Sequence, residues 1–200
     1  MLRVGLTGGL ACGKSFVGEE FARLGAHLVH ADELGHAVLE PGGEAYRAVV
    51  AEFGRGILDG EGRIDRPRLA AEVFGKPERL AALNALVHPP VVRREEDLIA
   101  GFAAGDPHGI AVVEAAILIE TGSYKRFDRV VLVECREEQQ IERAVRRGAT
   151  REEVLARLGR QMPPEEKRKF ADYVIDASGD KEDTLRQARR VYEELRRIKG

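Results

Sequence analysis

The sequence predicts an α/β fold in which helices flank a parallel sheet of five strands. Two observations carry this prediction: short runs rich in valine, isoleucine and leucine recur along the chain, and helical patterns separate them. Parallel strands need a crossover connection, and a helix is the usual one. Because such helices cover both faces of the sheet, the strand runs are largely apolar.

Each expected strand is a short run in which β-branched and other apolar residues predominate. These strands span residues 2–6, 26–30, 109–113, 129–134 and 173–175. The spacing of charged and apolar residues predicts three helices in the same domain. The last of them has its apolar side chains along one face. They span residues 15–24, 138–147 and 181–199.

The stretch between the second and third strands, residues 35–106, has helical patterning. Residues 70–74 and 77–87 show the apolar spacing of helices, and the Pro89–Pro90 pair predicts a break after them. The glycine-rich residues 54–65 are expected to form a surface loop. We therefore expect a helical insertion in the sheet domain.

Composition limits the possible classes of protein. The 200 residues, 44% of them hydrophobic, suffice for one sizeable core with appendages. The formal net charge is −2, and the arginines of the second half alternate with glutamates, which is typical of solvated helix faces. We therefore expect no nucleic-acid partner.

The two cysteines, Cys12 and Cys135, are far apart in the sequence and show no CxxC spacing, so neither a zinc site nor a disulfide framework is indicated. No basic-then-apolar leader opens the sequence, and no run reaches the roughly 20 apolar residues of a membrane helix. We expect a cytoplasmic protein that binds no membrane.

Residues 8–15 read GGLACGKS and match the phosphate-binding pattern GxxxxGK[ST] after a strand. Glycines let backbone N–H groups approach phosphate oxygens, and a helix that begins near Gly13 adds the positive end of its dipole. Lys14 supplies a point charge, and the Ser15 hydroxyl can bind Mg²⁺. These features predict ATP and Mg²⁺ binding, whereas the alternative is a glycine-rich turn without a ligand.

Asp32 directly follows the second expected strand, so it belongs at the same sheet edge as the phosphate-binding segment. A carboxylate there can accept the proton of an attacking hydroxyl. On position alone, an N-cap for the helix after it is an equal alternative. His27 and His30 have HxxH spacing, but a strand directs them to opposite faces, which disfavours a shared metal.

Glu114 ends the third expected strand, where an acid can reach the shell of a magnesium ion through water; a structural capping role is the alternative. Glu120 suits a functional or a surface position equally.

Arginines are frequent between residues 143 and 168, where a capping box at Thr150 is expected to open a short helix. Arg143 and Arg147 lie on one helix face and can clamp a triphosphate from a mobile lid. Ion pairs with Glu138 and Glu142 are the alternative.

Taken in order, these motifs resemble those of the dephospho-CoA kinases, a P-loop family that phosphorylates dephospho-CoA with ATP. The resemblance covers almost the whole chain. It rests on GLTGGLACGKS at 5–15, HAD at 30–32, DG at 59–60, IDR at 64–66, VHP at 87–89, VEAAILIE at 113–120, VEC at 133–135, Gln140, Arg143, Gln161 and ADYVID at 171–176.

The resemblance implies a P-loop NTPase-type core (residues 1–34, 107–140 and 169–200), a helical substrate domain (35–106) and a lid (141–168). It makes Asp32 the general base, with Lys14 and Arg143 in catalysis. Arg66, His88 and Glu114 are expected to bind substrate, and Ser15 the metal. The nucleotide is assigned to Gly8, Gly9, Ala11, Cys12, Gly13, Lys14, Ser15, Phe16 and Arg147.

The expected reaction is direct in-line transfer from ATP to the ribose 3′-hydroxyl of dephospho-CoA, by a monomer. Another P-loop small-molecule kinase, such as a nucleoside monophosphate kinase, is the alternative, because it differs only in the inserted helices. A GTPase switch lacks support, since the chain has no NKxD motif.

Several residues depart from the family pattern. Cys12 replaces a small, serine-like residue and Phe16 replaces a threonine, while Ala116 and Ala177 stand where proline and asparagine are common. The loss of one hydroxyl at Phe16 is expected to cost about 1 kcal/mol of ATP binding. The thiol of Cys12, near a helix N-terminus, is expected to be acidic and open to oxidation.

Overall fold

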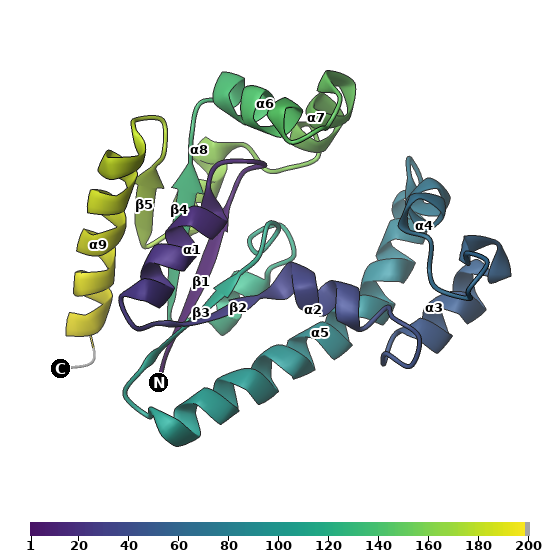
Figure 1. The fold of residues 1–200 in the computed structure, drawn as a ribbon, viewed down its shortest axis with the longest axis horizontal. Coiled ribbons are helices and arrows are strands. Elements are labelled where there is room, and N and C mark those ends of the chain that lie inside the picture. Colours follow the sequence, from purple (N-terminus) through teal and green to yellow (C-terminus); the bar gives the residue numbers. More distant parts are fainter. Residues whose placement is uncertain (199–200) are drawn as a thin grey trace. The chain divides into compact units, whose positions relative to one another are not determined.

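A computed structural model of the chain describes residues 1–198 and confirms a five-stranded, all-parallel sheet flanked by helices (Figure 1). The strands are β1 (Leu2–Gly8), β2 (His27–His30), β3 (Ile110–Glu114), β4 (Arg129–Glu134) and β5 (Tyr173–Asp176). Their order across the sheet is β2-β3-β1-β4-β5. Each predicted strand is present, with ends that differ by at most two residues.

The helices are α1 (Lys14–Arg23), α2 (Ala31–Ala37), α3 (Tyr46–Phe53), α4 (Arg66–Val73), α5 (Pro77–Gly105), α6 (Glu137–Arg146), α7 (Arg151–Leu158), α8 (Pro164–Lys167) and α9 (Lys181–Arg197). A helix is present at each predicted place, whereas α3 and α8 were not predicted and α5 is longer than predicted. Short 3-10 turns lie at Arg55–Ile57, Ser123–Arg126 and Arg168–Phe170. The predicted end of the last helix, residue 199, lies outside the described residues.

The register of the sheet aligns the carboxyl ends of its strands. Leu6 of β1 and His30 of β2 both pair with Glu114 of β3, and Gly8 pairs with Val133 of β4. Parallel strands place their carboxyl ends at one edge, so the polar residues that follow them share that edge.

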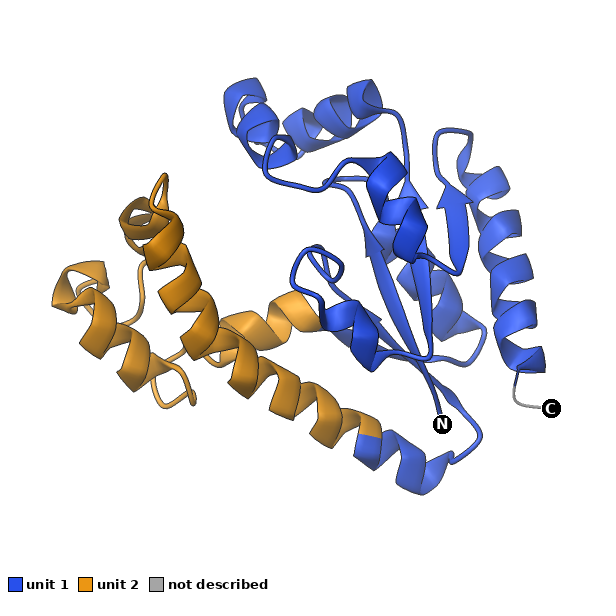
Figure 2. Ribbon diagram, turned by 180° about the vertical axis from the view of Figure 1, so that it is seen from behind, with its two compact units in different colours: residues 1–30, 100–200 blue, residues 31–99 orange. Residues whose placement is uncertain are grey.

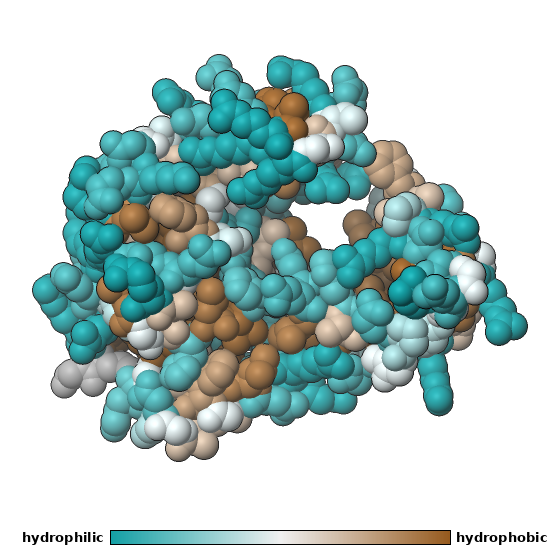
Figure 3. Space-filling view, in the orientation of Figure 1, coloured by the Kyte–Doolittle hydropathy of each residue, from teal (hydrophilic) through white to brown (hydrophobic). Residues whose placement is uncertain are grey.

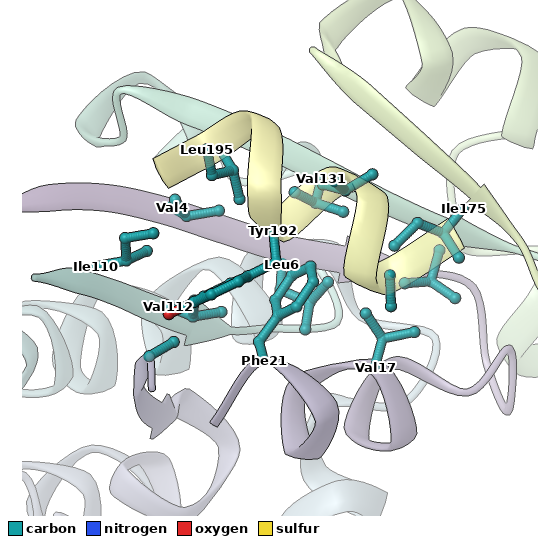
Figure 4. Packing of buried hydrophobic residues seen from close by; sticks show 14 of the residues in the cluster. Val4, Leu6, Val17, Phe21, Ile110, Val112, Val131, Ile175, Tyr192 and Leu195 are labelled. Carbon is teal, nitrogen blue, oxygen red and sulfur yellow. The ribbon is translucent and has the colours of Figure 1, made fainter. Parts of the chain in front are cut away.

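One face of the sheet packs against α1 and α9 (Figure 4). Alternate residues of β1, such as Val4 and Leu6, point to this face and meet Phe21 of α1 and Leu195 of α9. The Phe21 ring lies 6.0 Å from that of Tyr192. Full burial of each such side chain stabilises the fold by about 1.5–3 kcal/mol, so this layer fixes the position of α1.

The chain divides into two compact units, residues 31–99 and the rest (Figure 2). The unit of residues 31–99 has its own apolar core. Its buried members include Val38, Val49, Phe53, Ile57 and Leu69. The finer division into a core, a helical substrate domain and a lid stays a prediction.

The predicted break at the Pro89–Pro90 pair is wrong, because α5 continues through both prolines. Each proline removes one helical hydrogen bond and crowds the preceding turn, at a cost of about 3 kcal/mol. Leu86 before the pair and Val91 after it pack on the same apolar cluster. This packing on both sides keeps the helix continuous where its local sequence favours a break.

Hydrophilic residues cover much of the face shown in Figure 3, with hydrophobic residues in patches among them. Among residues 1–198, no helix has both the length and the apolar character needed to cross a membrane.

A buried carboxylate links the two helices of the core layer. Glu20 of α1, with a side chain 5% exposed, accepts hydrogen bonds from Arg23 and, at 2.7 Å, from Arg189 of α9. The hydrogen bonds from Arg23, the largest effect, lower the pKa of Glu20 from 4.5 to about 2, although burial opposes this.

The Glu20→Gln variant is expected to unfold more easily by about 1–3 kcal/mol near neutral pH, since it loses charge-assisted hydrogen bonds. Because the pKa is lower in the folded state, ionised Glu20 stabilises the protein fully above pH 4.5 and less as the pH falls towards 2. Urea unfolding at pH 7 and at decreasing pH measures this, with exposed Glu19→Gln as the control. An equal effect of the two variants at pH 7 would contradict the prediction.

Candidate active site

The P-loop (residues 8–15) connects β1 to α1 at the carboxyl edge of the sheet (Figure 1). A Cβ on Gly8 would lie 2.1 Å from the carbonyl oxygen of Val133, so only glycine fits there. Gly13 has a φ of 100° and caps α1, and Ala11 also has a positive φ, of 54°. α1 begins directly after Gly13, so the positive end of its dipole lies at this loop, and a glycine-rich loop before a helix is an arrangement that binds anions.

Lys14, the first residue of α1, keeps its ammonium group at this loop. Its Nζ donates hydrogen bonds of 3.2 Å to the carbonyl oxygens of Gly8 and Gly9. A positive charge therefore stands beside the predicted phosphate site. Phe16 lies in the first turn of α1, and its ring is near the start of α9, with Lys181 Nζ 5.9 Å from the ring centre. Its contact with the nucleotide stays a prediction.

Glu114, at the end of β3, joins three elements of the carboxyl edge. Its Oε1 accepts a 2.7 Å hydrogen bond from the Ser15 hydroxyl, and its Oε2 lies 3.0 Å from His30 Nδ1. We call these three residues the Glu114 cluster. Both carboxylate oxygens contact side chains of neighbouring elements, so the capping alternative for Glu114 is not supported.

The two histidines of the HxxH pattern contact different carboxylates. His30 lies beside Glu114, whereas His27 Nε2 is 3.2 Å from Asp106 and its ring stacks on Phe102. Within residues 1–198, no group of three or more His, Cys, Asp or Glu residues could hold a metal ion.

Asp32 lies in the first turn of α2, directly after β2. The helix begins at Ala31, so the N-cap alternative for Asp32 does not hold. The side chain is exposed, and its carboxylate has no hydrogen bond or ion pair within the described part of the chain. Asp32 belongs to the unit of residues 31–99, and its role as a base stays a prediction.

The other predicted substrate residues of that unit are Arg66 and His88. Arg66 is the exposed first residue of α4. His88 lies within α5, directly before the proline pair through which the helix continues. Burial lowers the pKa of His88, so its ring is neutral at pH 7.

The arginines predicted to clamp the nucleotide differ in their contacts. Arg143 Nη2 donates a 2.9 Å hydrogen bond to the carbonyl oxygen of Ala177, beyond β5. Arg147 is exposed at the end of α6. The ion-pair alternative fails for both within residues 1–198, since the arginine near Glu142 is Arg146, at 3.9 Å.

Residues 159–168, which follow α7, bind to the core through contacts that the sequence did not indicate. Gln161 Oε1 accepts a 3.0 Å hydrogen bond from the backbone N–H of Leu10 in the P-loop. Lys167, 2% exposed, lies 2.7 Å from Glu120. The sequence offered one signal for this ion pair, which is an acid soon after β3 and basic residues in the arginine-rich stretch. Glu120 is therefore more than a surface residue.

The same segment closes one side of a cavity of about 920 Å³. Arg168 Nε donates a 2.8 Å hydrogen bond to Glu134, at the end of β4. Residues of the P-loop, of the end of β4, of α6, of α7 and of the end of β5 also line the cavity. The capping box of α7 at Thr150 and Glu153 is present as predicted.

The two cysteines, which sequence spacing did not associate, meet in the wall of this cavity. Cys12 of the P-loop and Cys135 after β4 are both buried, with their sulfur atoms 3.5 Å apart. The strand register that pairs Gly8 with Val133 produces this contact.

Comparison with known proteins gives matches over nearly the whole chain. A family model described as dephospho-CoA kinase (CoaE) matches residues 2–183. The dephospho-CoA kinases of Aquifex aeolicus and Thermobifida fusca are 43% and 41% identical to this chain. Each alignment covers 98% of this chain, with 99% and 98% of the relatives covered.

Solved structures share the fold. TT1252 from Thermus thermophilus has a TM-score of 0.83 at 35% identity, with 97% of each chain covered. The dephospho-CoA kinase from Campylobacter jejuni has a TM-score of 0.70 at 26% identity, with 98% of each chain covered. Shikimate kinase from Bacteroides thetaiotaomicron, 15% identical with a TM-score of 0.52 over 97% and 98% of the chains, shows the same P-loop fold alone.

The Gly13→Ala variant is expected to bind MgATP at least about tenfold more weakly, because a shift of the loop loses at least one charge-assisted hydrogen bond. Its matched control is Gly42→Ala in the other unit, since both glycines have positive φ, 100° and 89°, and open space around the position of a Cβ. In both variants, alanine at a positive φ is expected to lower the free energy of unfolding in urea by a similar amount, about 1–2 kcal/mol. Calorimetric titration with MgATP distinguishes the two variants. Equal MgATP affinities of Gly13→Ala and Gly42→Ala would count against nucleotide binding at the P-loop.

Proposed function

Because the chain belongs to the dephospho-CoA kinase family, a family of enzymes that phosphorylate dephospho-CoA with ATP, we propose that it transfers the γ-phosphoryl group in line to the ribose 3′-hydroxyl. It is a kinase of coenzyme A biosynthesis. The observation that best supports the proposed chemistry is the P-loop beside the Glu114 cluster, at one edge of the sheet.

Mg²⁺ fits the residues of this site. The Ser15 hydroxyl and the Glu114 carboxylate are oxygen donors 2.7 Å apart, and oxygen is the ligand atom that Mg²⁺ prefers. We assign Ser15 as the direct protein ligand, with Glu114 reaching the ion through water. When bound, the ion neutralises phosphate charge during transfer. No larger set of protein ligands is needed, because Mg²⁺ in kinases is also held by the nucleotide.

In the proposed mechanism, Asp32 orients the ribose hydroxyl and accepts its proton as the new P–O bond forms, while the bond from the γ-phosphorus to the bridging oxygen breaks and ADP leaves. Lys14 leaves the Gly8 and Gly9 carbonyl oxygens for the phosphates, which offer a charged partner in place of neutral ones. Arg143 and Arg147 from the lid (residues 141–168) offset the charge on the transferred group. No covalent phosphoenzyme forms.

We assign dephospho-CoA binding to the helical domain of residues 35–106. Arg66 is exposed and charged, which suits a phosphate group of the substrate. His88 is neutral at pH 7, because burial lowers its pKa, so it can offer a hydrogen bond without adding charge. We further propose that the enzyme acts as a cytoplasmic monomer, with no nucleic-acid partner.

The assignment of the acceptor is tested with a panel of substrates. The protein and MgATP are incubated with dephospho-CoA, adenosine, AMP and other nucleoside monophosphates, and mass spectrometry identifies each product. The expected result is a single new phosphate on the 3′-hydroxyl of dephospho-CoA. Phosphorylation of a monophosphate in place of dephospho-CoA would favour a nucleoside monophosphate kinase.

The Asp32→Asn variant is expected to lower kcat by about 10²–10⁴, the range for loss of a general base, with little change in MgATP affinity. Glu33→Gln is the matched control, because Glu33 is the adjacent exposed acid on α2. Steady-state kinetics with dephospho-CoA and calorimetric titration with MgATP measure the two effects. Near-normal turnover of Asp32→Asn would exclude Asp32 as the base.

A further inference from the structure

We propose that Cys12 and Cys135 form a reversible disulfide that weakens nucleotide binding by the P-loop. This inference rests on the proposed function only in assigning the nucleotide to that loop. The two residues are 123 positions apart in the sequence, yet their sulfur atoms lie 3.5 Å apart. A disulfide bond is about 2.05 Å long, so the sulfurs need to approach by about 1.5 Å.

A small oxidant can reach the pair. Both residues are buried, but both line the cavity of about 920 Å³ beside the P-loop. Cys12 and Cys135 belong to the wall of this cavity, together with the end of β4 and residues of 155–168, and 1% and 7% of their surfaces are exposed. Hydrogen peroxide is small enough to enter such a space.

The contact also prepares Cys12 as the nucleophile. A hydrogen bond from the Cys135 thiol, the largest effect, lowers the pKa of Cys12 from 9.0 to about 7, with a further contribution from the charge of Lys14. The same contact raises the pKa of Cys135. Near neutral pH, much of Cys12 is thus a thiolate, the reactive form, beside a protonated partner.

The chemistry has two steps. The Cys12 thiolate attacks one oxygen of hydrogen peroxide, breaks the O–O bond and releases hydroxide, which leaves a sulfenic acid. Cys135 sulfur then attacks the Cys12 sulfur, the S–O bond breaks, and the thiol proton leaves with the hydroxyl as water. Two thiols have lost two electrons, and peroxide has gained them. A dithiol reductant restores both thiols by exchange.

The proposed disulfide would pull on the P-loop backbone at a position with an unusual conformation. Cys12 lies between Ala11 and Gly13, both at positive φ, and its sulfur is 2.9 Å from the position that a Cβ on Gly9 would take. Movement of Cys12 towards Cys135 therefore shifts the backbone of the P-loop, including the Cys12 N–H group, which donates a 3.3 Å hydrogen bond to the Gly9 carbonyl oxygen. Such donors lose strength steeply when their geometry changes.

The first test asks whether the bond forms. The reduced protein is treated with a small excess of hydrogen peroxide at pH 7, and intact mass and peptide mapping follow. We expect a loss of two hydrogens, a crosslinked pair of peptides containing Cys12 and Cys135, and full reversal by dithiothreitol. The Cys135→Ser variant is expected to give sulfenic acid or higher oxides at Cys12 with no crosslink. Oxidation of the wild type to the same products without a crosslink would overturn the proposal.

The second test asks what the bond does. MgATP affinity is measured by calorimetry for oxidised and reduced samples of each protein, so every variant is compared with its own reduced form. We expect at least about tenfold weaker binding by the crosslinked wild type, equal to about 1.4 kcal/mol. Equal affinities of the crosslinked and reduced wild type would overturn the proposal. Neither test uses dephospho-CoA, so failure of the reduced protein to phosphorylate it would contradict the proposed function and leave this inference standing.

Discussion

The site depends on one constraint, which is that parallel strands end at a common edge. Glu114 pairs in register with Leu6 and with His30, so the P-loop after β1 and the chain after β2 begin beside the same carboxylate. The hydrogen bond from Ser15 to Glu114 then fixes the start of α1 relative to β3. If the register moved by one residue, Glu114 would point to the other face of the sheet and the cluster would be lost.

The same edge accounts for the contacts of residues 159–168. Acids stand at or soon after the ends of β3 and β4, and bases of this segment bind them: Lys167 contacts Glu120 and Arg168 contacts Glu134. A third bond, from Leu10 to Gln161, reaches the P-loop itself. The C-terminal part of the predicted lid is therefore joined to the P-loop by a hydrogen bond and to the sheet edge by ion pairs.

One expectation failed, and one contact was not foreseen, because sequence spacing considers only neighbouring residues. The Pro89–Pro90 pair disfavours a helix locally, but packing of Leu86 and Val91 on one core outweighs that cost. Cys12 and Cys135 show no motif spacing, yet adjacent strands bring them into contact. Sequence spacing carries no information about either arrangement, because both depend on which surfaces meet after folding.

The sequence by itself determined the class of fold, the place of each strand and the P-loop, because apolar periodicity and glycine placement act over a few residues. It also placed Asp32 directly after its strand and Glu114 at the end of its strand. The tertiary structure alone decided that Glu114 accepts a hydrogen bond from Ser15, that Glu120 binds Lys167, and that two distant thiols touch. These contacts follow from strand order and register, which long-range packing selects and no local pattern encodes.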